Sequence, residues 1–357
     1  MEFKKDFKYS LVCPTSMGVR ITPFDRQPVH TASEFKMQAT SAESNVLSIS
    51  AALGLKTKVL TTFVKDSPIA RLIKRDLSRR GIDFEGKDVE QDGPWGYRHQ
   101  FNIADSGFGL RAPHVQNDRA GEVGRTLNLK DFDVDRIFGV EGVQLLHISG
   151  LIAALSDETG QFCLALAKAA KAHGTRISFD LNYRASFWKN RHETLNKIFS
   201  DIAGVADILI GNEEDFQLAL GIHGPEAGGK SIGEKIEGFK GLIDNVKKAY
   251  PNAQTFATTL RQVENANEHL WGAILRDGDT WTVIEPRPIQ VYDRIGGGDG
   301  FVGGMLYGYL SGWTSEKSAQ FGWATGAYVV SIAEDFGLPL DEDQIWAIYA
   351  GNARVKR

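Results

Sequence analysis

The sequence predicts an α/β protein with a mostly parallel, doubly wound sheet and a small second sheet. Two observations lead to this prediction. From about Gly142 onward, short apolar runs alternate with segments of helical periodicity, which is typical of strand–helix units in a parallel sheet. Residues about 90–125 are instead rich in glycine and in alternating patterns, which is typical of extended strands in a subsidiary sheet or lid.

The individual elements follow from these patterns in chain order. We expect a helix at residues 44–55 (SNVLSISAALGL) and a strand at 58–64 (KVLTTFV). Further strands are expected at 143–149, 176–182, 206–212 and 253–260, and a hairpin at 269–284. Helices are expected at 157–174, 213–221 and 231–250, the first two of them ending at a glycine.

The composition is that of an ordinary globular protein. The chain has 357 residues, of which 42% are hydrophobic and 24% charged, so it can bury a sizeable core. A formal net charge of −4 gives no indication of nucleic acid or an anionic membrane as a partner. The sequence shows no signal-peptide pattern, no apolar run of transmembrane length, and only two cysteines, Cys13 and Cys163. We therefore expect a cytoplasmic protein with reduced thiols.

Polar segments follow four of the apolar runs. They are FDLNYR, IGNEED, TTLR and GGGD. Ligands of doubly wound sheets bind outside the carboxyl ends of the strands, so we expect these segments at one edge of the sheet. They supply residue types that hold phosphates and Mg²⁺, namely Arg184, Asn212, Glu214, Asp215 and Arg261.

Two glycine motifs are weaker indications. Gly224–Ser231 (GPEAGGKS) matches the P-loop pattern with Lys230 as its lysine, but a helical segment precedes it where a P-loop needs a strand. We interpret it as a surface connection between helices. Gly298, Gly300 and Gly303 form a literal GxGxxG, but it comes late in the chain and no acidic partner follows at the required spacing. We therefore do not expect a dinucleotide site.

The segment Asp293–Phe301 (DRIGGGDGF) is the most informative one. Three consecutive glycines, Gly296 to Gly298, precede Asp299, and an apolar helical segment follows. A carboxylate near a helix N-terminus is stabilised by the helix dipole, and glycines there also leave N–H groups open to a phosphate. Asp299 is therefore either a helix cap or a member of a phosphate-handling site, and the other polar segments favour the second.

These residues resemble the PfkB (ribokinase-like) family of carbohydrate kinases. The family signature Asp-Thr-x-Gly-Ala-Gly-Asp-x-Phe is matched by DRIGGGDGF, with Arg294 for Thr and Gly297 for Ala. The version here, together with SFDLNYRASFW, ILIGNEEDF, TTLR and the final ARVKR, is similar to the 2-keto-3-deoxygluconate kinases of bacteria. The resemblance extends from about Glu43 to the C-terminus. It implies a three-layer α/β/α kinase domain over residues 1–357, with lid strands from about 10–38 and 90–125.

The resemblance also implies an activity and its residues. The enzyme would transfer the γ-phosphoryl group of ATP, with Mg²⁺, to a primary hydroxyl of a sugar or sugar acid, most simply 2-keto-3-deoxygluconate. Asp299 would be the general base, and the N–H groups of Gly296, Gly297 and Gly298 would form the anion hole. The acceptor would contact Glu43, Asn45, Asn102, Asn117, Arg119 and Arg184. The nucleotide would contact Asn182, Arg184, Asn212, Arg261, Gly296 and Gly298, with Glu214 and Asp215 near the metal, in part through water.

The sequence departs from the family in the part that binds the acceptor. Thr15 and Ser16 stand where the family has Gly-Glu, and Thr40 and Ser41 stand where it has Gly-Gly. Asn102 and Asn117 replace the two lid tyrosines of 2-keto-3-deoxygluconate kinases, whereas Arg119 is kept and would suit a carboxylate. Such changes can shift selectivity strongly in a polar site.

Three alternatives therefore stay open at this point. The acceptor could be another keto-sugar or sugar acid, or the chain could be a degenerate member of the family that binds a sugar without catalysis. A P-loop nucleotidase acting through Lys230 is the third. A homodimer through the lid strands is plausible by analogy, because an exposed sheet edge favours strand pairing. His147, in an apolar run, is expected to be a core histidine.

Overall fold

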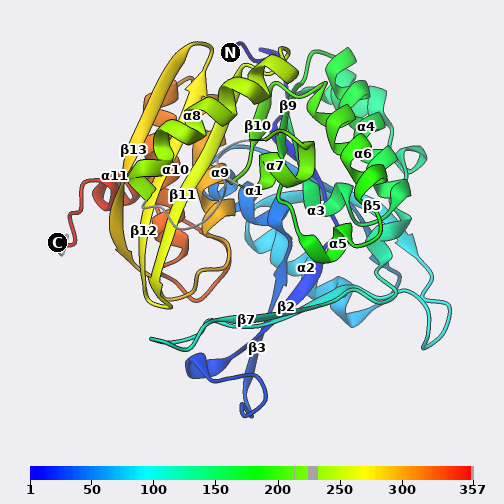
Figure 1. Cartoon of the computed structure of the whole chain (residues 1–357). Coiled ribbons are helices and arrows are strands. Elements are labelled where there is room, and N and C mark those ends of the chain that lie inside the picture. The colour runs from blue at the N-terminus through cyan, green and yellow to red at the C-terminus, as the bar shows by residue number, and fades with distance from the viewer. Residues whose placement is uncertain (213, 224–231, 355–357) are drawn as a thin grey trace. The chain divides into compact units, whose positions relative to one another are not determined.

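The computed structural model describes residues 1–212, 214–223 and 232–354 (Figure 1). The chain divides into two compact units. Unit 1 contains Met1–Pro14, Arg125–Arg261 and Gly272–Pro286. Unit 2 contains Thr15–Gly124, Gln262–Trp271 and Arg287–Arg357. That residues 1–357 act as one domain stays a prediction.

Among the described residues, nine strands form the larger sheet, in the order β13-β12-β11-β10-β9-β8-β1-β4-β5. Its strands are β1 (Tyr9–Pro14), β4 (Thr57–Val64), β5 (Ile82–Val89), β8 (Val143–Ser149), β9 (Arg176–Asp180), β10 (Ile208–Ile210), β11 (Thr255–Asn265), β12 (Glu268–Asp277) and β13 (Thr280–Gln290). The pairs β1–β8, β8–β9, β9–β10, β10–β11 and β4–β5 are parallel. The predicted mostly parallel sheet is therefore confirmed.

The central strands are apolar because both of their faces are covered. All seven residues of β8 and all eight of β4 are buried. Parallel strands buried on both faces read as continuous apolar runs rather than alternating ones, which is the pattern that identified them in the sequence. His147 lies in β8, fully buried, and burial lowers its pKa to about 3. It is the neutral core histidine that the sequence predicts.

The helices of unit 1 follow its strands. They are α3 (Gly150–Ala153), α4 (Asp157–Ala172), α5 (Ala185–Trp188), α6 (His192–Ala203), α7 (Asp215–Leu220) and α8 (Ile232–Ala249). A capping box of Ser156 and Thr159 begins α4, and Gly174, with φ 79°, follows its C-cap. Short single-turn segments lie at Phe24–Arg26, Val123–Thr126 and Leu129–Asp131, and a π-helix at Asp135–Gly142.

Two helices of unit 2 pack closely against a third, α9 (Gly297–Leu310). The helices of this unit are α1 (Ala42–Ala52), α2 (Pro68–Arg79), α9, α10 (Ser315–Val329) and α11 (Glu342–Tyr349). A Cβ added at Gly304 of α9 would lie 2.0 Å from Thr325 Oγ1 of α10, and one at Gly303 would lie 2.7 Å from the Val46 carbonyl oxygen of α1. These glycines let α9 approach both neighbours with little side-chain volume between them. Helix packing therefore explains Gly303 of the GxGxxG match.

The smaller sheet lies wholly in unit 2 and has the order β3-β2-β6-β7. Its strands are β2 (Gly18–Pro23), β3 (Phe35–Thr40), β6 (Gln100–Asp105) and β7 (His114–Asp118). Figure 1 shows β2 and β3 (blue) in the same part of the molecule as β7 (cyan), and β6 pairs with both β2 and β7 although these strands are far apart in the sequence. The strand β1 belongs to the larger sheet, so the smaller one begins at Gly18.

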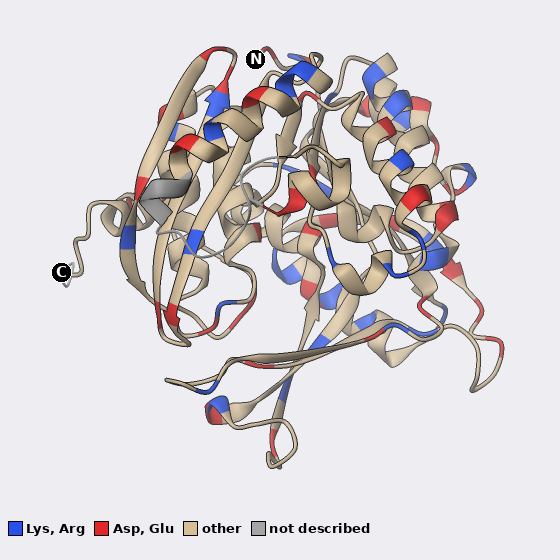
Figure 2. Cartoon of the chain, viewed as in Figure 1, with Lys and Arg blue, Asp and Glu red and all other residues tan. Residues whose placement is uncertain are grey.

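The structure contains no helix, within its described residues, that is long and apolar enough to cross a membrane. Figure 2 shows acidic and basic residues interleaved along helices such as α4 and α6. This mixture agrees with the small net charge.

Candidate functional site

The predicted anion hole is the first turn of helix α9. Gly296 is the N-cap, with φ 85°, and its carbonyl oxygen accepts the first helical hydrogen bond from Gly300 N at 2.8 Å. The helix thus begins three residues earlier than the sequence predicts, and Gly297, Gly298 and Asp299 form its first turn. The first N–H groups of a helix have no carbonyl partner within it, so this turn presents backbone donors and the positive end of the dipole.

Two glycines of this turn differ in what an added side chain would meet. A Cβ at Gly296 would lie 1.9 Å from the Asp335 carbonyl oxygen, and its φ of 85° disfavours any other residue. A Cβ at Gly298, in contrast, would meet no other described atom within 4 Å. Glycine inside a helix costs about 1 kcal/mol relative to alanine. The packing of the described residues therefore does not account for Gly298, whereas the close approach of a ligand would.

Asp299 is held by a residue from helix α1. The Asn45 Nδ2 atom donates a hydrogen bond of 3.0 Å to Asp299 Oδ2. Asn45 is only 3% exposed, and the contact of Gly303 with α1 fixes the spacing between the two helices. Two residues from opposite ends of the sequence are therefore placed together by close helix packing.

The other N-terminal candidates form two buried clusters. Thr15 Oγ1 donates to Glu43 Oε2 at 2.7 Å. Ser16 Oγ and Arg119 Nη1 both donate to Glu122 Oε1, at 2.5 Å and 2.7 Å. Glu122 is fully buried, and nothing in the sequence motifs indicated it. The hydroxyl groups that replace the family's Gly-Glu are thus used to hold two buried carboxylates.

Asn102 and Asn117 are direct neighbours across β6 and β7. Asn102 Nδ2 donates to Asn117 Oδ1 at 2.9 Å. The register of the sheet places Asn102 opposite Arg20 of β2, and Arg20 opposite Gln38 of β3. Four polar residues therefore form one row across a single face of the smaller sheet. The opposite face carries apolar residues, including Ile21, Met37 and Ile103.

Thr40 and Ser41, which replace the family's two glycines, have partners within the fold. Thr40 Oγ1 donates to Asp335 Oδ2 at 2.5 Å, and Gln38 Nε2 donates to Asp335 Oδ1 at 2.6 Å. Ser41 is the N-cap of α1 and accepts a hydrogen bond from Ser44 N at 3.0 Å. Side chains thus lie where the family has bare backbone.

The remaining candidates lie in unit 1, in the segments after β9 and β10. Asn182 has φ 40°, a left-handed conformation that asparagine tolerates better than most residues, and it is 9% exposed. Its backbone N–H donates to Asp180 Oδ1 at 3.2 Å, which forms the turn at the strand end. Arg184 is exposed, and its Nη1 donates to the Tyr183 carbonyl oxygen at 2.8 Å.

Asp215 joins these two segments. Its Oδ1 accepts from Tyr183 N at 3.0 Å, and its Oδ2 accepts from Asn212 N at 2.7 Å. Burial raises the pKa of Asp215 to about 6, against the opposing effect of these backbone hydrogen bonds and of the Arg184 charge. Asn212 Oδ1 accepts from Glu214 N and Asp215 N at 2.8 and 3.1 Å, so its side chain caps α7. Both oxygens of Asp215 are thus engaged by backbone.

Arg261 lies in a different kind of element from the one that the sequence predicts, and the metal candidate Glu214 lies at the surface. Arg261 lies inside β11 rather than in a loop, four residues beyond Ala257, which pairs with the last residue of β10. Glu214 is exposed. Over the ranges that the structure describes, no group of three or more His, Cys, Asp or Glu residues could hold a metal ion. The P-loop match at Gly224–Ser231 lies outside the described residues.

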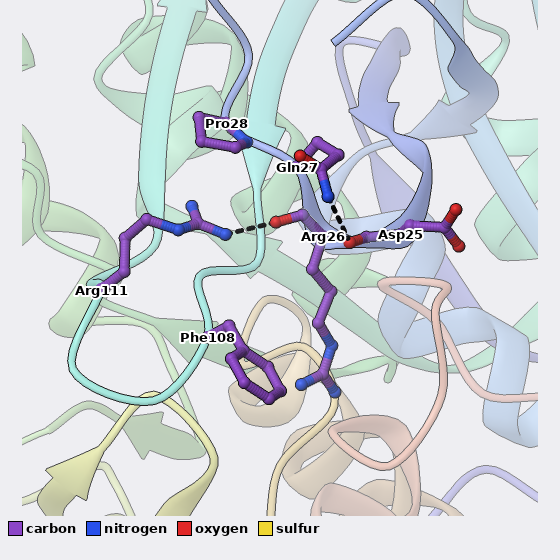
Figure 3. A pocket seen from close by; sticks show the side chains of 6 residues that line it. All are labelled: Asp25, Arg26, Gln27, Pro28, Phe108 and Arg111. Carbon is purple, nitrogen blue, oxygen red and sulfur yellow. Dashed lines mark hydrogen bonds between the residues drawn. The ribbon is translucent and has the colours of Figure 1, made fainter. Parts of the chain in front are cut away.

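A pocket of about 490 Å³ lies at the tips of the smaller sheet (Figure 3). The Arg26 guanidinium stacks on Tyr292 at 4.0 Å from the ring centre, and Arg111 donates to the Arg26 carbonyl oxygen. Figure 3 shows the Arg26 side chain beside Phe108. The pocket contains none of the predicted site residues, so it is not the predicted active site.

Comparisons with known proteins show the family to which the chain belongs. The model of the pfkB family of carbohydrate kinases matches residues 130–334, more than half of the chain. The chain is 28% identical to the 2-dehydro-3-deoxygluconokinase of Bacillus subtilis, over 88% of this chain and 87% of that one. It is 26% identical to the 5-dehydro-2-deoxygluconokinase of Clostridium tetani, over 85% and 82%.

Solved structures give the same result. The 2-dehydro-3-deoxygluconokinase of Thermotoga maritima superposes with a TM-score of 0.86 and 26% identity, over 96% of this chain and 100% of that one. A putative ribokinase II from E. coli, in complex with ATP and Mg²⁺, shares the fold at 14% identity and a TM-score of 0.75. The protein thus has the ribokinase-like fold of a carbohydrate kinase. The chain belongs to the pfkB family, whose members use ATP and Mg²⁺.

Proposed function

We propose that this protein transfers the γ-phosphoryl group of ATP to a primary hydroxyl of a sugar acid, with Asp299 as general base. The observation that carries the proposal is the first turn of α9. It combines a carboxylate held by Asn45, backbone donors at Gly296–Gly298, and a glycine at 298 that the packing of the described residues does not require. These are the parts that phosphoryl transfer needs, because its catalysis is mainly positioning and charge stabilisation.

The steps follow from these groups. Asp299 removes the proton of the acceptor hydroxyl as that oxygen attacks the γ-phosphorus. The bond from the γ-phosphorus to the bridging oxygen breaks, and ADP leaves with the bond's electron pair. The N–H groups of Gly296, Gly297 and Gly298 stabilise the negative charge on the transferring group, and loss of one such donor typically costs about a hundredfold in rate or more.

We assign the nucleotide phosphates to Asn182, Arg184, Asn212 and Arg261. Bound Mg²⁺ would neutralise charge on the phosphates. Mg²⁺ usually keeps several waters and takes only one or two protein carboxylates, so the exposed Glu214 fits this role. Asp215 would act through its hold on the two loops or through water, because both of its oxygens already accept backbone hydrogen bonds.

We propose a keto sugar acid as the acceptor, with 2-keto-3-deoxygluconate first among the candidates. The names of the similar kinases supply this class. Glu43, Asn45, Asn102, Asn117, Arg119 and Arg184 are the residues we assign to it. The asparagine pair offers amide donors and acceptors, and Arg119 offers a guanidinium to a carboxylate. A related keto-sugar or sugar acid is the alternative within the same reaction.

We further propose a cytoplasmic homodimer in which the apolar face of the smaller sheet is covered by a second copy. Met37 is 45% and Phe35 37% exposed on this face, and both come from the edge strand β3. An exposed apolar edge strand favours pairing with another chain. Light scattering of wild type and of Met37→Asp tests this, and a dimer that persists unchanged in the variant would contradict it.

The activity is tested by ADP release from Mg-ATP with a panel of acceptors. The panel contains 2-keto-3-deoxygluconate, 2-keto-3-deoxygalactonate, 5-keto-2-deoxygluconate, gluconate, fructose and ribose. We expect one sugar acid to drive turnover, and Asp299→Asn to lower kcat by about 10²- to 10⁴-fold. Rapid turnover by the Asn variant would exclude Asp299 as the base. Sugar-dependent thermal stabilisation without turnover would favour the non-catalytic alternative.

A further inference from the structure

A buried ion pair joins the smaller sheet to the start of the catalytic segment. Arg20, in the middle of β2, has no exposed side-chain surface, and its Nη2 bonds to Asp293 Oδ2. Asp293 is 1% exposed, and its other oxygen accepts from Ile295 N at 3.0 Å. This carboxylate therefore shapes the backbone immediately before Gly296, and the guanidinium of Arg20 fixes the carboxylate.

A second contact, at Gly296 itself, is held from the same sheet. The Asp335 carbonyl oxygen lies against the Cα of Gly296, where a Cβ would be 1.9 Å away. The side chain of Asp335 accepts from Gln38 and Thr40 of β3. Arg20 and Gln38 are direct cross-strand partners. Two neighbouring strands thus hold two acidic residues, Asp293 shortly before the N-cap of α9 in the chain and Asp335 in contact with it.

Stability alone does not account for Arg20. Of its N–H groups, those at Nε and Nη1 are buried without a hydrogen-bond partner among the described residues. Burying a charge pair is favourable only when the remaining donors are also satisfied, and a hydrophobic pair of similar size often does as well or better. The pair therefore adds little to the free energy of unfolding, and its main effect is to fix the position of Asp293.

We propose that Arg20 is a positioning residue for phosphoryl transfer. It acts through Asp293 and sets the first turn of α9 from the face of the smaller sheet that also carries Asn102 and Asn117. This rests on the proposed function, since it assigns Arg20 to that reaction. The same row of side chains would then serve both the acceptor and the anion hole. No sequence motif indicated this, because Arg20 and Asp293 are 273 residues apart.

The test separates positioning from folding by removing the charges singly and together. Arg20→Met leaves the Asp293 carboxylate buried without its partner, and Asp293→Leu leaves the Arg20 guanidinium buried without its partner. Both single variants should therefore melt at a lower temperature than wild type. The double variant Arg20→Met/Asp293→Leu has an apolar pair instead and should recover most of the melting temperature. We expect its kcat to stay about 10- to 100-fold below wild type, with KM for ATP changed by less than about threefold.

A matched control is Lys58→Met, which breaks the Lys58–Glu85 pair between β4 and β5. Neither strand contributes a candidate site residue, so kcat should not change. A double variant that regains wild-type kcat along with its melting temperature would overturn the proposal.

A second measurement does not depend on turnover. Amide hydrogen exchange of the segment 293–301 should be faster in the stable double variant than in wild type, because the Ile295 N–H and the helix start lose their support. Unchanged protection there would also overturn the proposal. If wild type phosphorylates no acceptor in the panel, the proposed function fails, whereas the exchange experiment still decides whether Arg20 positions this segment.

Discussion

The candidate residues of the two units are held in different ways. In unit 2, side chains bond to side chains far away in the sequence, such as Asn45 to Asp299 and Ser16 to Glu122, with separations of 254 and 106 residues. In unit 1, side chains bond to backbone, mostly within a few residues, as Asn212 does to Glu214 N, and Asp215 reaches Tyr183 N across 32 residues. Local turns therefore shape the proposed nucleotide segments, whereas tertiary packing assembles the proposed catalytic and acceptor residues.

This difference predicts that substitutions in unit 2 have larger effects than those in unit 1. The largest effects are expected at two neighbouring glycines. Gly296→Ala meets both a positive φ and the Asp335 carbonyl oxygen, so we expect a loss of about 2–5 kcal/mol in the free energy of unfolding. In Gly298→Ala the added methyl group contacts no atom of another described segment, and alanine has the higher helix propensity. The variant should therefore be as stable as wild type or up to about 1 kcal/mol more stable.

Gly298→Ala should have a large effect on activity although it has little effect on stability. A methyl group at Gly298 would lie where the phosphoryl group is expected to approach, so kcat of the stable Gly298→Ala should fall about a hundredfold. Urea unfolding and steady-state kinetics on the same samples measure both quantities. Full activity in Gly298→Ala would mean that no ligand approaches this turn, which contradicts the anion hole.

The next effect is expected at Asn45. In Asn45→Ala the carboxylate of Asp299 loses its 3.0 Å hydrogen bond and with it a fixed orientation. We expect kcat to fall about 10- to 100-fold and stability to fall by only about 1 kcal/mol. Ser48→Ala on the same helix is the control, because its hydroxyl donates to the Ser44 carbonyl oxygen and accepts from Arg80 Nη1, and neither partner is a candidate site residue. Equal losses of kcat in both variants would indicate a general effect of α1 rather than orientation of the base.

How much the sequence could predict follows from the same contrast. The strands and helices of unit 1 rest on residues close together in the chain, and periodicity finds such features. The signature at Gly296–Asp299 was found because its chemistry lies in consecutive residues. Glu122, Arg20 and Asp335 could not be found, because a buried side chain acquires its role only when distant segments pack together. Arg261 was expected in a loop because the length of β11 depends on its pairing in the sheet rather than on its own residues.

The effect expected in unit 1, at Asp215, is on stability rather than on kcat, and it depends on pH. Its pKa is raised to about 6, above the ordinary value near 3.9, so the folded state binds a proton more tightly than the unfolded chain. The free energy of unfolding should therefore fall as pH rises from about 4 to about 6, by up to about 3 kcal/mol from this group. Asp215→Asn should flatten the stability curve in this window, and Glu214→Gln, at an exposed position, should not. An unchanged curve in Asp215→Asn would show that another group titrates there.

The smallest effect is expected at Lys230. The P-loop interpretation requires this lysine to bind phosphates, and its loss would abolish ATP turnover. The proposed site instead uses the first turn of α9, so Lys230→Ala should keep kcat and KM for ATP within about twofold of wild type. Because the substitution removes only one charge from a segment that we interpret as a connection between helices, its melting temperature should also be unchanged. A variant that melts like wild type but has lost ATP turnover would move the nucleotide phosphates to Gly224–Ser231. In that case the expectation that substitutions in unit 2 have larger effects than those in unit 1 would be wrong.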